Sequence, residues 1–405
     1  MSEMNKVSAA KDREAIARET LLYVCGCAVR NEIPDAGIVC KADMSMLHQM
    51  SKRQLLEAYV YWALSKGSIF NQTDPKISDA WRNDYWTALR KATLMGAERE
   101  ELIQFLEEKH IWYLPLKGLI LKDFYSEYGV RQMSDNDFLF DLSYADAVKD
   151  WFLSRGYEHK TDLLEKHDEY RMKPVYNFEM HRCLFAAGET AWADYYQDVK
   201  ERLQKDAGNG YGYHFSDEDF YIYFIAHACR HLVKSGTGLR TLVDLYLYVV
   251  AKTELDWKYI ERELRKLGLA REERKMRHIA SKVFRDRSAN PMRNMTDEEA
   301  AYLEIFFSSG TYGTLQNKVL SRLQVLGKPE KGANRGRKVL MAAQYIRRRL
   351  FQHDALRRKK YQVFYEHWWL RPILPFYRLG RGIVYSRERM KEEIKSLVRF
   401  VKRSR

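Results

Sequence analysis

Residues 113–142, YLPLKGLILKDFYSEYGVRQMSDNDFLFDL, contain the pattern from which the fold of the chain can be predicted. The apolar residues before Lys117 and Gly118 predict a short strand, and the apolar positions of residues 119–125 recur near the helical period. In residues 135–140, DNDFLF, successive side chains alternate between the two faces of a second strand. The stretch therefore predicts a strand, a glycine turn, a helix and a second strand.

Asp135 and Asp137 lie two residues apart on the second strand, so both side chains point to the same face. Two neighbouring carboxylates repel each other and are costly to keep ionised unless a cation lies between them. The alternative is a solvated strand end, where both carboxylates face water. The glycine turn and the helix N-terminus before this strand, which together can hold a phosphate, favour the first interpretation.

The residues Leu116-Lys117-Gly118, the pair Phe124-Tyr125 and the run RQMSDND at 131–137 resemble the "KG…lY…R.msDiD" signature of an uncharacterised bacterial nucleotidyltransferase family. This family is similar to the superfamily typified by DNA polymerase beta, in which a glycine turn precedes an Asp-x-Asp strand. The resemblance covers residues 98–248. It implies an α+β fold, with a small mixed β-sheet core and flanking helices, between helical N-terminal and C-terminal regions.

The resemblance also implies a reaction, the transfer of a nucleoside monophosphate from an NTP to an acceptor hydroxyl or phosphate. Two Mg²⁺ ions would stabilise both ends of an in-line displacement. The implied catalytic residues and metal ligands are Asp135, Asp137 and Glu179, the last of them from a neighbouring strand. The alternative function is a non-catalytic binding or regulatory protein that kept the fold. Its basic tail would contact nucleic acid or a membrane surface, or it would be one partner of a toxin and antitoxin type pair.

Four residues near the paired carboxylates are the predicted nucleotide and phosphate contacts: Lys117, Gly118, Arg131 and Ser134. Lys117 and Arg131 can balance the charge of a triphosphate, and Gly118 lets it approach the backbone. Three of these residues also have a structural interpretation. Lys117 would be a surface cation at a strand end, Arg131 the partner of a nearby carboxylate, and Ser134 the donor of a turn hydrogen bond.

Residues 170–184, YRMKPVYNFEMHRCL, are rich in strand formers, and Pro174 divides them into two predicted short strands. In the second of these, alternation places Glu179 and His181 on one face and Phe178 and Met180 on the other. The family pattern resembles acid-x-His at this point. The resemblance therefore assigns His181 to the site as a second-shell or acceptor-binding residue.

A helix is predicted from residue 217 to residue 233, DEDFYIYFIAHACRHLV. Its apolar stripe is expected to be buried, which leaves four residues on the opposite side: Tyr223, His227, Arg230 and His231. His227 and His231, with Arg240 after them, either contact the nucleotide or acceptor or make helix-packing contacts, with Arg240 and Asp244 as an i,i+4 pair. A third alternative makes His227 and His231 zinc ligands, together with His181 in a zinc hydrolase.

The rest of the chain divides into regions around this core. We expect a helical N-terminal region at 1–95, the nucleotidyltransferase-like core at 96–215, a helical bundle at 216–290 and a basic, aromatic-rich helical region at 291–405. Helices are predicted at 15–29, 46–65, 78–94, 98–109 and 144–154, and a charged helix at 254–290. Residues 188–215, which contain three glycines at alternate positions, predict a boundary loop.

Positive charge is concentrated in the C-terminal region. Residues 311–405 hold 25 Lys and Arg against 6 Asp and Glu, a net charge of +19, so that residues 1–310 carry −5 of the total of +14. Basic clusters interleaved with Trp368, Trp369, Phe376 and Tyr377 predict a contact through residues 340–405 with nucleic acid or with an anionic membrane surface. The alternative is a solvated charged face.

Cysteine content and hydropathy favour a cytoplasmic protein, with peripheral association at the membrane as an option. Five cysteines without a Cys-x-x-Cys pair argue against a disulfide framework and against a zinc ribbon. The first 15 residues show no secretory signal, and no stretch approaches the ~18 uninterrupted apolar residues of a spanning helix. The acceptor, the preferred base and the oligomeric state are not predicted.

Overall fold

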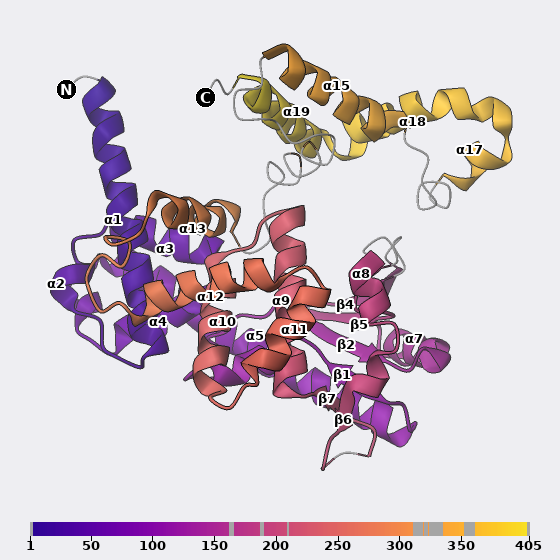
Figure 1. Ribbon diagram of the computed structural model, residues 1–405, viewed down its shortest axis with the longest axis horizontal. Coiled ribbons are helices and arrows are strands. Elements are labelled where there is room, and N and C mark those ends of the chain that lie inside the picture. Colours follow the sequence, from indigo (N-terminus) through magenta and orange to yellow (C-terminus); the bar gives the residue numbers. More distant parts are fainter. Residues whose placement is uncertain are drawn as a thin grey trace. The chain divides into compact units, whose positions relative to one another are not determined.

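The computed structural model describes residues 3–161, 166–186, 190–208, 210–310, 319, 323, 335–351 and 361–402. The chain forms two compact units (Figure 1). The first comprises Met1–Cys229 and Gly238–Phe307, and the second comprises Arg230–Thr237 and Ser308–Arg405. The cluster Arg357-Arg358-Lys359-Lys360, part of the predicted basic contact surface, lies outside the described residues.

A mixed five-stranded sheet forms the centre of the first unit, in the order β1-β2-β5-β4-β3. β2 runs parallel to β5, and the other neighbouring strands are antiparallel. The strands are β1 (Tyr113–Pro115), β2 (Asn136–Phe140), β3 (Glu158–Thr161), β4 (His167–Met172) and β5 (Tyr176–His181). This sheet, with its flanking helices, confirms the expected α+β fold, and Pro174 separates β4 from β5 as predicted.

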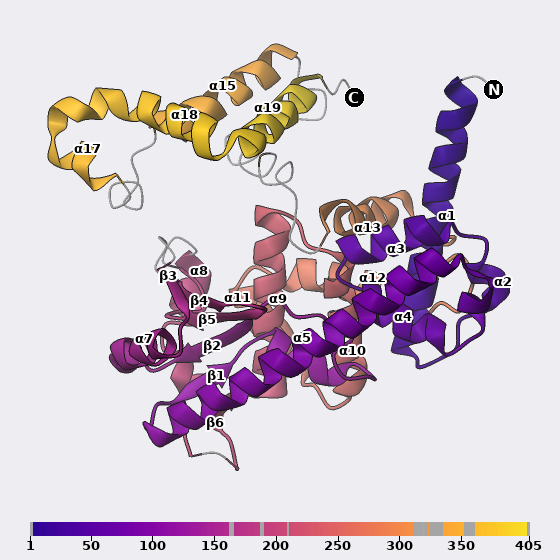
Figure 2. The ribbon, with the colours of Figure 1, turned by 180° about the vertical axis from the view of Figure 1, so that it is seen from behind.

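One face of the sheet packs against α5 (Pro75–Glu108) and α7 (Ala145–Ser154), and Figure 2 shows α5 running along the strands. The core on this face is apolar and strongly aromatic. Its buried residues include Leu102, Leu106, Phe138, Phe140, Val148, Phe152, Tyr170, Phe178 and Met180. Because each large apolar side chain contributes ~1.5–3 kcal/mol when buried, this packing fixes which face of β2 and β5 is left for polar groups.

α5 is one continuous helix, so the prediction of separate helices at 78–94 and 98–109 is wrong. Asp74 caps it by accepting from the Lys76 amide at 2.8 Å, and Pro75 occupies the first position. Gly96, within the gap between the two predicted helices, lies inside α5, and a Cβ there would meet the Tyr128 hydroxyl at 3.3 Å. Gly96 therefore allows close packing instead of breaking the helix. The predicted boundary between residues 95 and 96 lies within α5.

The N-terminal region is helical, as predicted, but residues 46–65 form two helices and not one. Leu55 takes a φ of +51°, and the Leu56 amide donates to the Ser51 carbonyl at 3.0 Å, which closes the end of the first helix. Gln54 keeps this turn in place by accepting from the Leu239 amide at 2.8 Å. The helices are α1 (Glu3–Val29), α2 (Ala36–Val39), α3 (Met44–Arg53) and α4 (Glu57–Ser65).

The predicted loop at 188–215 contains regular structure. Its elements are α8 (Thr190–Tyr195), η4 (Val199–Arg202) and the hairpin of β6 (Leu203–Lys205) and β7 (Tyr213–Phe215). The Tyr113 amide donates to the Tyr211 carbonyl at 3.1 Å, and Tyr113 pairs with Gly212. The glycine-rich turn therefore lies beside β1. Its polar composition alone does not predict this position.

Two helices follow the hairpin, α9 (Asp217–Lys234) and α10 (Leu239–Ala251). The predicted stripe of α9 is buried at Ile222, Ile225 and Cys229, but Tyr223 is buried as well, against the prediction. The Tyr223 ring packs with Phe185, Tyr196 and Phe215, which explains its burial.

The charged segment at 254–290 forms α11 (Trp257–Lys266) and α12 (Ala270–Arg285), separated at Gly268 with a φ of +70°. α13 (Asp297–Ser309) follows them. Trp257 and Tyr259 of α11 both contact α9. The Trp257 ring lies 5.6 Å from that of Tyr221, and the Tyr259 hydroxyl donates to Asp219 at 2.9 Å.

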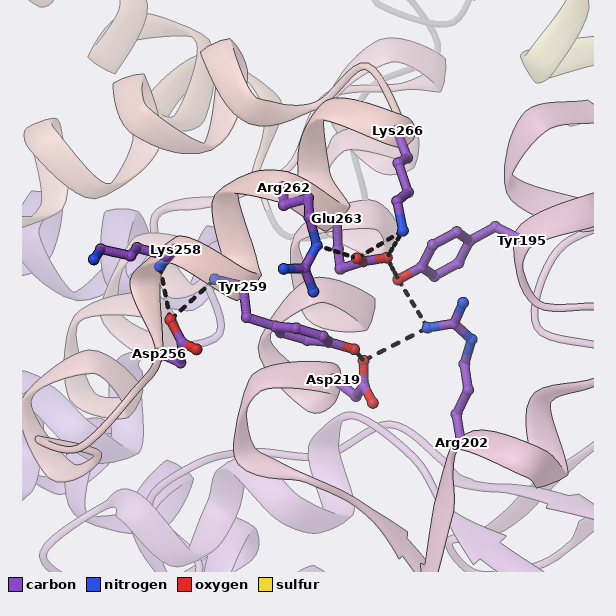
Figure 3. A network of polar contacts seen from close by, with 9 residues as sticks. All are labelled: Tyr195, Arg202, Asp219, Asp256, Lys258, Tyr259, Arg262, Glu263 and Lys266. Carbon is purple, nitrogen blue, oxygen red and sulfur yellow. Dashed lines mark hydrogen bonds and ion pairs between the residues drawn. The ribbon is translucent and has the colours of Figure 1, made fainter.

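A polar network joins α11 to α8, η4 and α9 (Figure 3). The Glu263 carboxylate is its centre and accepts from the Tyr195 hydroxyl at 3.0 Å and from Lys266 Nζ at 2.8 Å. Arg202 donates to the same Tyr195 hydroxyl at 3.0 Å and lies 3.8 Å from Asp219. Since Glu263 is buried, these contacts compensate its charge and fix the segment after β5 against the helices.

The second unit is helical, as predicted for the C-terminal region. Its elements are α15 (Arg335–Phe351), α17 (Gln362–Glu366), η5 (Trp368–Ile373), α18 (Leu374–Tyr385) and α19 (Arg387–Lys402). α15, α18 and α19 pack together, and their small core includes Met341, Tyr345 and Leu397 (Figure 1). Among the described helices of the whole chain, none has the length and apolar character that crossing a membrane requires.

Candidate active site

The register between β2 and β5 places Asp137 directly beside Glu179. Phe138, Phe178 and Met180 belong to the apolar core, so the alternating carboxylates of Asp137 and Glu179 point to the opposite face of the sheet. Asp135 immediately precedes β2. Strand alternation and strand pairing therefore bring together the three acids expected from the sequence.

The three carboxylates destabilise one another's charge. Burial and then the charge of Asp137 raise the pKa of Asp135 to about 6, and burial, Asp137 and Asp135 raise the pKa of Glu179 to about 8. Asp137 differs, because burial opposes its charge but Lys117 and His181 outweigh that effect and hold its pKa well below the usual range. This concentration of negative charge suits the binding of a cation.

Lys117 lies at the end of β1 with its Nζ 3.4 Å from both carboxylate oxygens of Asp137. Burial disfavours its charge, but Asp137 together with Tyr223, Asp135 and Glu179 outweighs burial, and the pKa of Lys117 is raised. Its backbone has a φ of +42°, a conformation that costs ~1–3 kcal/mol in a residue with a side chain. Lys117 is therefore a mostly buried residue of the site, and its interpretation as a surface cation is wrong.

Arg131 forms a buried ion pair with Asp244 of α10, with Nε to Oδ1 and Nη2 to Oδ2 both at 2.8 Å. The Tyr125 hydroxyl donates to the same carboxylate at 2.7 Å. A Cβ on Gly118 would lie 2.9 Å from Arg131 Nη1. The structural interpretation of Arg131 as a carboxylate partner is thus confirmed, and Gly118 makes room for its guanidinium.

The predicted helix after Gly118 is only the single turn α6 (Gly118–Leu121), followed by η2 (Lys122–Phe124). The chain becomes extended at Tyr125, with φ −85° and ψ 141°, where the Tyr125 hydroxyl reaches Asp244. The predicted helix over residues 119–125 is therefore shorter than expected. Any phosphate contact from this turn rests on Lys117 and on the backbone at Gly118.

Three cations act on Asp135. Lys117, then Arg240 of α10 and Lys91 of α5 lower the pKa of Asp135, against the larger effects of burial and Asp137. Arg240 also donates from Nη1 to the Gln132 carbonyl at 2.5 Å. The packing interpretation paired Asp244 with Arg240. In the structure the Asp244 carboxylate instead accepts two hydrogen bonds from Arg131. Lys91 was missed by sequence reasoning because no motif spacing connects it to the strands.

Ser134 and Asn136 flank Asp135 in different ways. The Ser134 carbonyl accepts from Asn177 Nδ2 at 3.4 Å, across β2 and β5. Asn136 is buried and donates to the Met95 carbonyl of α5 at 3.2 Å. Its side chain therefore lies on the core face, away from the carboxylates, where the sequence pattern placed it.

His181 lies beside the carboxylates, as expected from the resemblance. Its Nε2 is 2.7 Å from Asp137 Oδ1 and its side chain is only 2% exposed. Burial lowers the pKa of His181 to about 3, against the opposing effect of the hydrogen bond with Asp137. His167 of β4 pairs with His181 across the sheet and was missed by sequence reasoning. The predicted strand began at Tyr170, whereas β4 begins at His167, so His167 lay outside the predicted strand.

His227 and His231 lie on α9, one turn apart. His227 is partly buried, with its ring 6.3 Å from that of Tyr223, and His231 is exposed. In the described part of the chain, the group of potential metal ligands with donor atoms within 4.8 Å of one another is His167, Glu179 and His181. That group contains neither His227 nor His231, so the proposed zinc triad with His181 is not the one the fold assembles.

The model of a family described as uncharacterised nucleotidyltransferases matches residues 41–285. The chain belongs to this family. The match extends beyond the resemblance at 98–248, since it includes α3 and α4 before the sheet and α11 and α12 after it. The nucleotidyltransferase family therefore accounts for most of the first unit. Neither the curated proteins nor the solved structures contain a match to the chain.

Proposed function

We propose that the chain is a Mg²⁺-dependent nucleotidyltransferase that transfers a nucleoside monophosphate from an NTP to an acceptor hydroxyl or phosphate. The observation that carries this proposal is the register of β2 and β5, which pairs Asp137 with Glu179 beside Asp135. Membership of the nucleotidyltransferase family supports the class of reaction. Dependence on Mg²⁺ and the nature of the acceptor go beyond that membership.

The side chains present fit a divalent cation. Three carboxylates with mutually unfavourable charges supply the oxygen ligands that Mg²⁺ prefers. Asp135, Asp137 and Glu179 would hold two Mg²⁺ ions, which when bound would neutralise charge on the triphosphate and polarise the reacting phosphoryl group.

The remaining residues of the site have roles in binding and proton transfer. Lys117, Lys91 and Arg240 place positive charge around Asp135 and Asp137 and would bind the triphosphate. The Glu179 carboxylate would accept the proton of the acceptor hydroxyl. Arg131 acts through its pair with Asp244, which fixes the segment between Gly118 and the start of β2 against α10.

Isothermal titration of each of the four NTPs with Mg²⁺ tests this proposal. We expect the wild type to bind at least one NTP, and the double variant Asp135→Asn/Asp137→Asn to lose that binding. Asp146→Asn, which neutralises an exposed carboxylate on α7, is the matched control and should bind as the wild type. Equal binding by the wild type and the double variant, or none by either, would contradict the proposal.

Pyrophosphate release separates an enzyme from a protein that kept only the binding function. An active nucleotidyltransferase should release pyrophosphate from the NTP that it binds, once a suitable acceptor is supplied from a panel of small hydroxyl and phosphate compounds and acceptor proteins. A non-catalytic module would bind the NTP without release, at any acceptor concentration.

A further inference from the structure

We propose that His167, Glu179 and His181 form a binding site for a divalent transition-metal ion, such as Mn²⁺ or Zn²⁺. The inference rests on the proposed function, because Glu179 belongs to both sites. The ion at Glu179 would be a transition metal in place of the second Mg²⁺, and the ion at Asp135 and Asp137 would remain Mg²⁺.

The geometry of the three side chains is that of a metal site before binding. His167 Nε2 and His181 Nε2 each lie 3.7 Å from Glu179 Oε2, and one donor atom from each of the three residues lies within 4.8 Å of the others. Donor atoms bound at ~2.0–2.2 Å to one ion are ~3 Å or slightly more apart. Small rotations of the side chains are therefore enough to close the site.

The sheet makes this arrangement rigid. The β4 and β5 register pairs His167 with His181, and Glu179 lies two residues before His181 on the same face. The two imidazole rings are 5.2 Å apart. Since all three side chains come from paired strands, their positions depend on the backbone ladder and not on a loop.

The donor set selects against Mg²⁺. Mg²⁺ prefers oxygen ligands in an octahedral arrangement, whereas imidazole nitrogen suits Zn²⁺ and the later first-row metals, and Mn²⁺ accepts mixed nitrogen and oxygen sets. Two imidazoles and one carboxylate therefore favour a transition metal. His181 Nε2 now lies 2.7 Å from Asp137 Oδ1, so a metal ion would take the place of the proton between them and bring Asp137 close to its coordination sphere.

Full-length protein loaded with MnCl₂, without nucleotide, provides the test. Pulsed electron paramagnetic resonance detects coupling between Mn²⁺ and the ¹⁴N nuclei of bound imidazole. We expect this coupling in the wild type, and at least a tenfold weaker Mn²⁺ affinity in His167→Gln, which removes one of the ligands. His159→Gln is the control, since His159 lies on the neighbouring strand β3 and is hydrogen-bonded to Asp168 at 3.0 Å.

Asp135→Asn separates the failure of this inference from the failure of the proposed function. Asp135 is not part of the histidine site, so this variant should keep the ¹⁴N coupling while losing binding of NTP with Mg²⁺. Mn²⁺ bound by the wild type without ¹⁴N coupling, or with equal affinity in His167→Gln, would overturn the inference and leave the carboxylate site unaffected. Absence of any NTP binding alongside intact ¹⁴N coupling would overturn only the nucleotidyltransferase proposal.

An independent observation in the second unit concerns α18. We propose that its exposed apolar face binds the surface of an anionic lipid bilayer. Phe376 is 73% exposed and Val384 is 71% exposed. Further large apolar side chains on or next to α18 are exposed as well: Trp368, Trp369, Ile373, Tyr377, Leu379, Ile383 and Tyr385. Exposed apolar side chains gathered on one short segment mark an interaction surface.

The helix has two distinct sides. Leu374 is buried, and Arg378 donates to the carbonyls of Leu350 and Arg349 at the end of α15, which identifies the side that packs within the unit. At 100° per residue, Phe376, Leu379 and Ile383 lie together on the opposite side. The face proposed for lipid is therefore the one directed away from α15.

Charge and side-chain type favour a bilayer over nucleic acid. The net charge of +19 in residues 311–405 complements anionic headgroups and nucleic-acid phosphates equally well. Aromatic rings can stack on bases, but the aliphatic side chains of Leu379, Ile383 and Val384 cannot. Aliphatic and aromatic groups on one helix face, with arginines beside them, are typical of interfacial helices that bury the apolar face at the acyl boundary.

Sedimentation of full-length protein with vesicles tests this proposal. We expect binding to phosphatidylcholine vesicles that contain ~30% phosphatidylglycerol, and about tenfold weaker binding for Phe376→Ser/Ile383→Ser, because two large apolar groups of the lipid-facing side no longer enter the lipid. Trp86→Ser, which removes an exposed aromatic residue of α5, should bind as the wild type. Equal pelleting of the double variant and the wild type would overturn the proposal. So would binding to duplex DNA or RNA without binding to vesicles.

Discussion

Arg131 and Asp244, separated by 113 residues in the sequence, form a bidentate ion pair with two contacts of 2.8 Å, and the side chains are 7% and 5% exposed. The pair joins the segment that carries the paired aspartates to α10. Two further residues adjoin this ion pair. Gly118 leaves room for the Arg131 guanidinium because it has no Cβ, and the Tyr125 hydroxyl donates to Asp244. The architecture of the candidate site therefore depends on a contact that lies outside the Asp-x-Asp motif.

Replacement of Asp244 by Ala should lower the free energy of unfolding by about 3–5 kcal/mol, because it leaves the Arg131 guanidinium buried without its partner. Arg131→Lys should also destabilise the protein, since a lysine cannot make both contacts. The double variant Arg131→Met/Asp244→Leu should lose less than Asp244→Ala, because no charge remains buried. Urea unfolding measures all three. A double variant that loses the sum of both single losses would contradict this account.

Gly118→Ala should destabilise the protein by about 1–3 kcal/mol, because the added Cβ would lie 2.9 Å from Arg131 Nη1 and the guanidinium cannot move without breaking its pair. Gly208→Ala is the matched control, since a Cβ there meets nothing within 4 Å. In the Arg131→Met/Asp244→Leu background the cost of Gly118→Ala should fall markedly. An unchanged cost in that background would show that the glycine is needed for another reason.

Glu299 supplies a prediction about pH. The Thr296 amide donates to it at 2.7 Å, and Lys282 and His278 contact it at 2.7 and 2.6 Å. Hydrogen bonds from Lys282, Thr296 and His278 lower the pKa of Glu299 from 4.5 to about 2. A carboxylate with a lowered pKa stabilises the folded state fully above its ordinary pKa, and that contribution is lost as the pH falls toward about 2.

The Thr296 amide donates to the Glu299 carboxylate and the Glu299 amide donates to the Thr296 hydroxyl, a capping box at the start of α13. Glu299→Gln keeps an acceptor for the Thr296 amide and removes the charge. We expect it to lower the free energy of unfolding by about 0.5–1 kcal/mol at pH 7, with the difference from the wild type shrinking between pH 4.5 and pH 2. Urea unfolding at several pH values, followed by circular dichroism, measures this difference. Asp297→Asn, an exposed residue of the same helical turn, controls for interaction with the helix dipole. A difference that stays constant with pH would contradict the assignment.

The parts of the site that follow local periodicity were predictable from the sequence. Strand alternation places the side chains of Asp137 and Phe138 on opposite faces of the sheet, and those of Glu179 and His181 on the same face. The family resemblance then indicated that the two strands are neighbours. The helices predicted at 15–29 and 144–154 were predictable for the same reason, because apolar spacing is a local property.

The remaining parts depend on contacts between distant segments. Nothing in the spacing of Arg131 indicates Asp244, and Lys91 joins the site because α5 crosses the sheet. The continuity of α5 through Gly96 depends on the close approach of Tyr128, and the break at Leu55 depends on a backbone turn without Gly or Pro. Sequence reasoning missed these features because the decisive partner is remote or the local signal is absent.

Lys117→Met should weaken the binding of NTP with Mg²⁺ about tenfold or more, because it removes an ammonium group that lies 3.4 Å from both oxygens of Asp137 and would contact the triphosphate. Lys122→Met is the matched control, since Lys122 lies five residues further along and pairs with Asp123. Calorimetric titration of both variants with the NTP that the wild type binds provides the measurement. Equal weakening in both variants would indicate a general effect of net charge, and unchanged affinity in Lys117→Met would remove Lys117 from the nucleotide site. A loss confined to Lys117→Met would support a contact between the Lys117 ammonium and the triphosphate. The strained backbone of Lys117, with a φ of +42°, would then serve to position this cation.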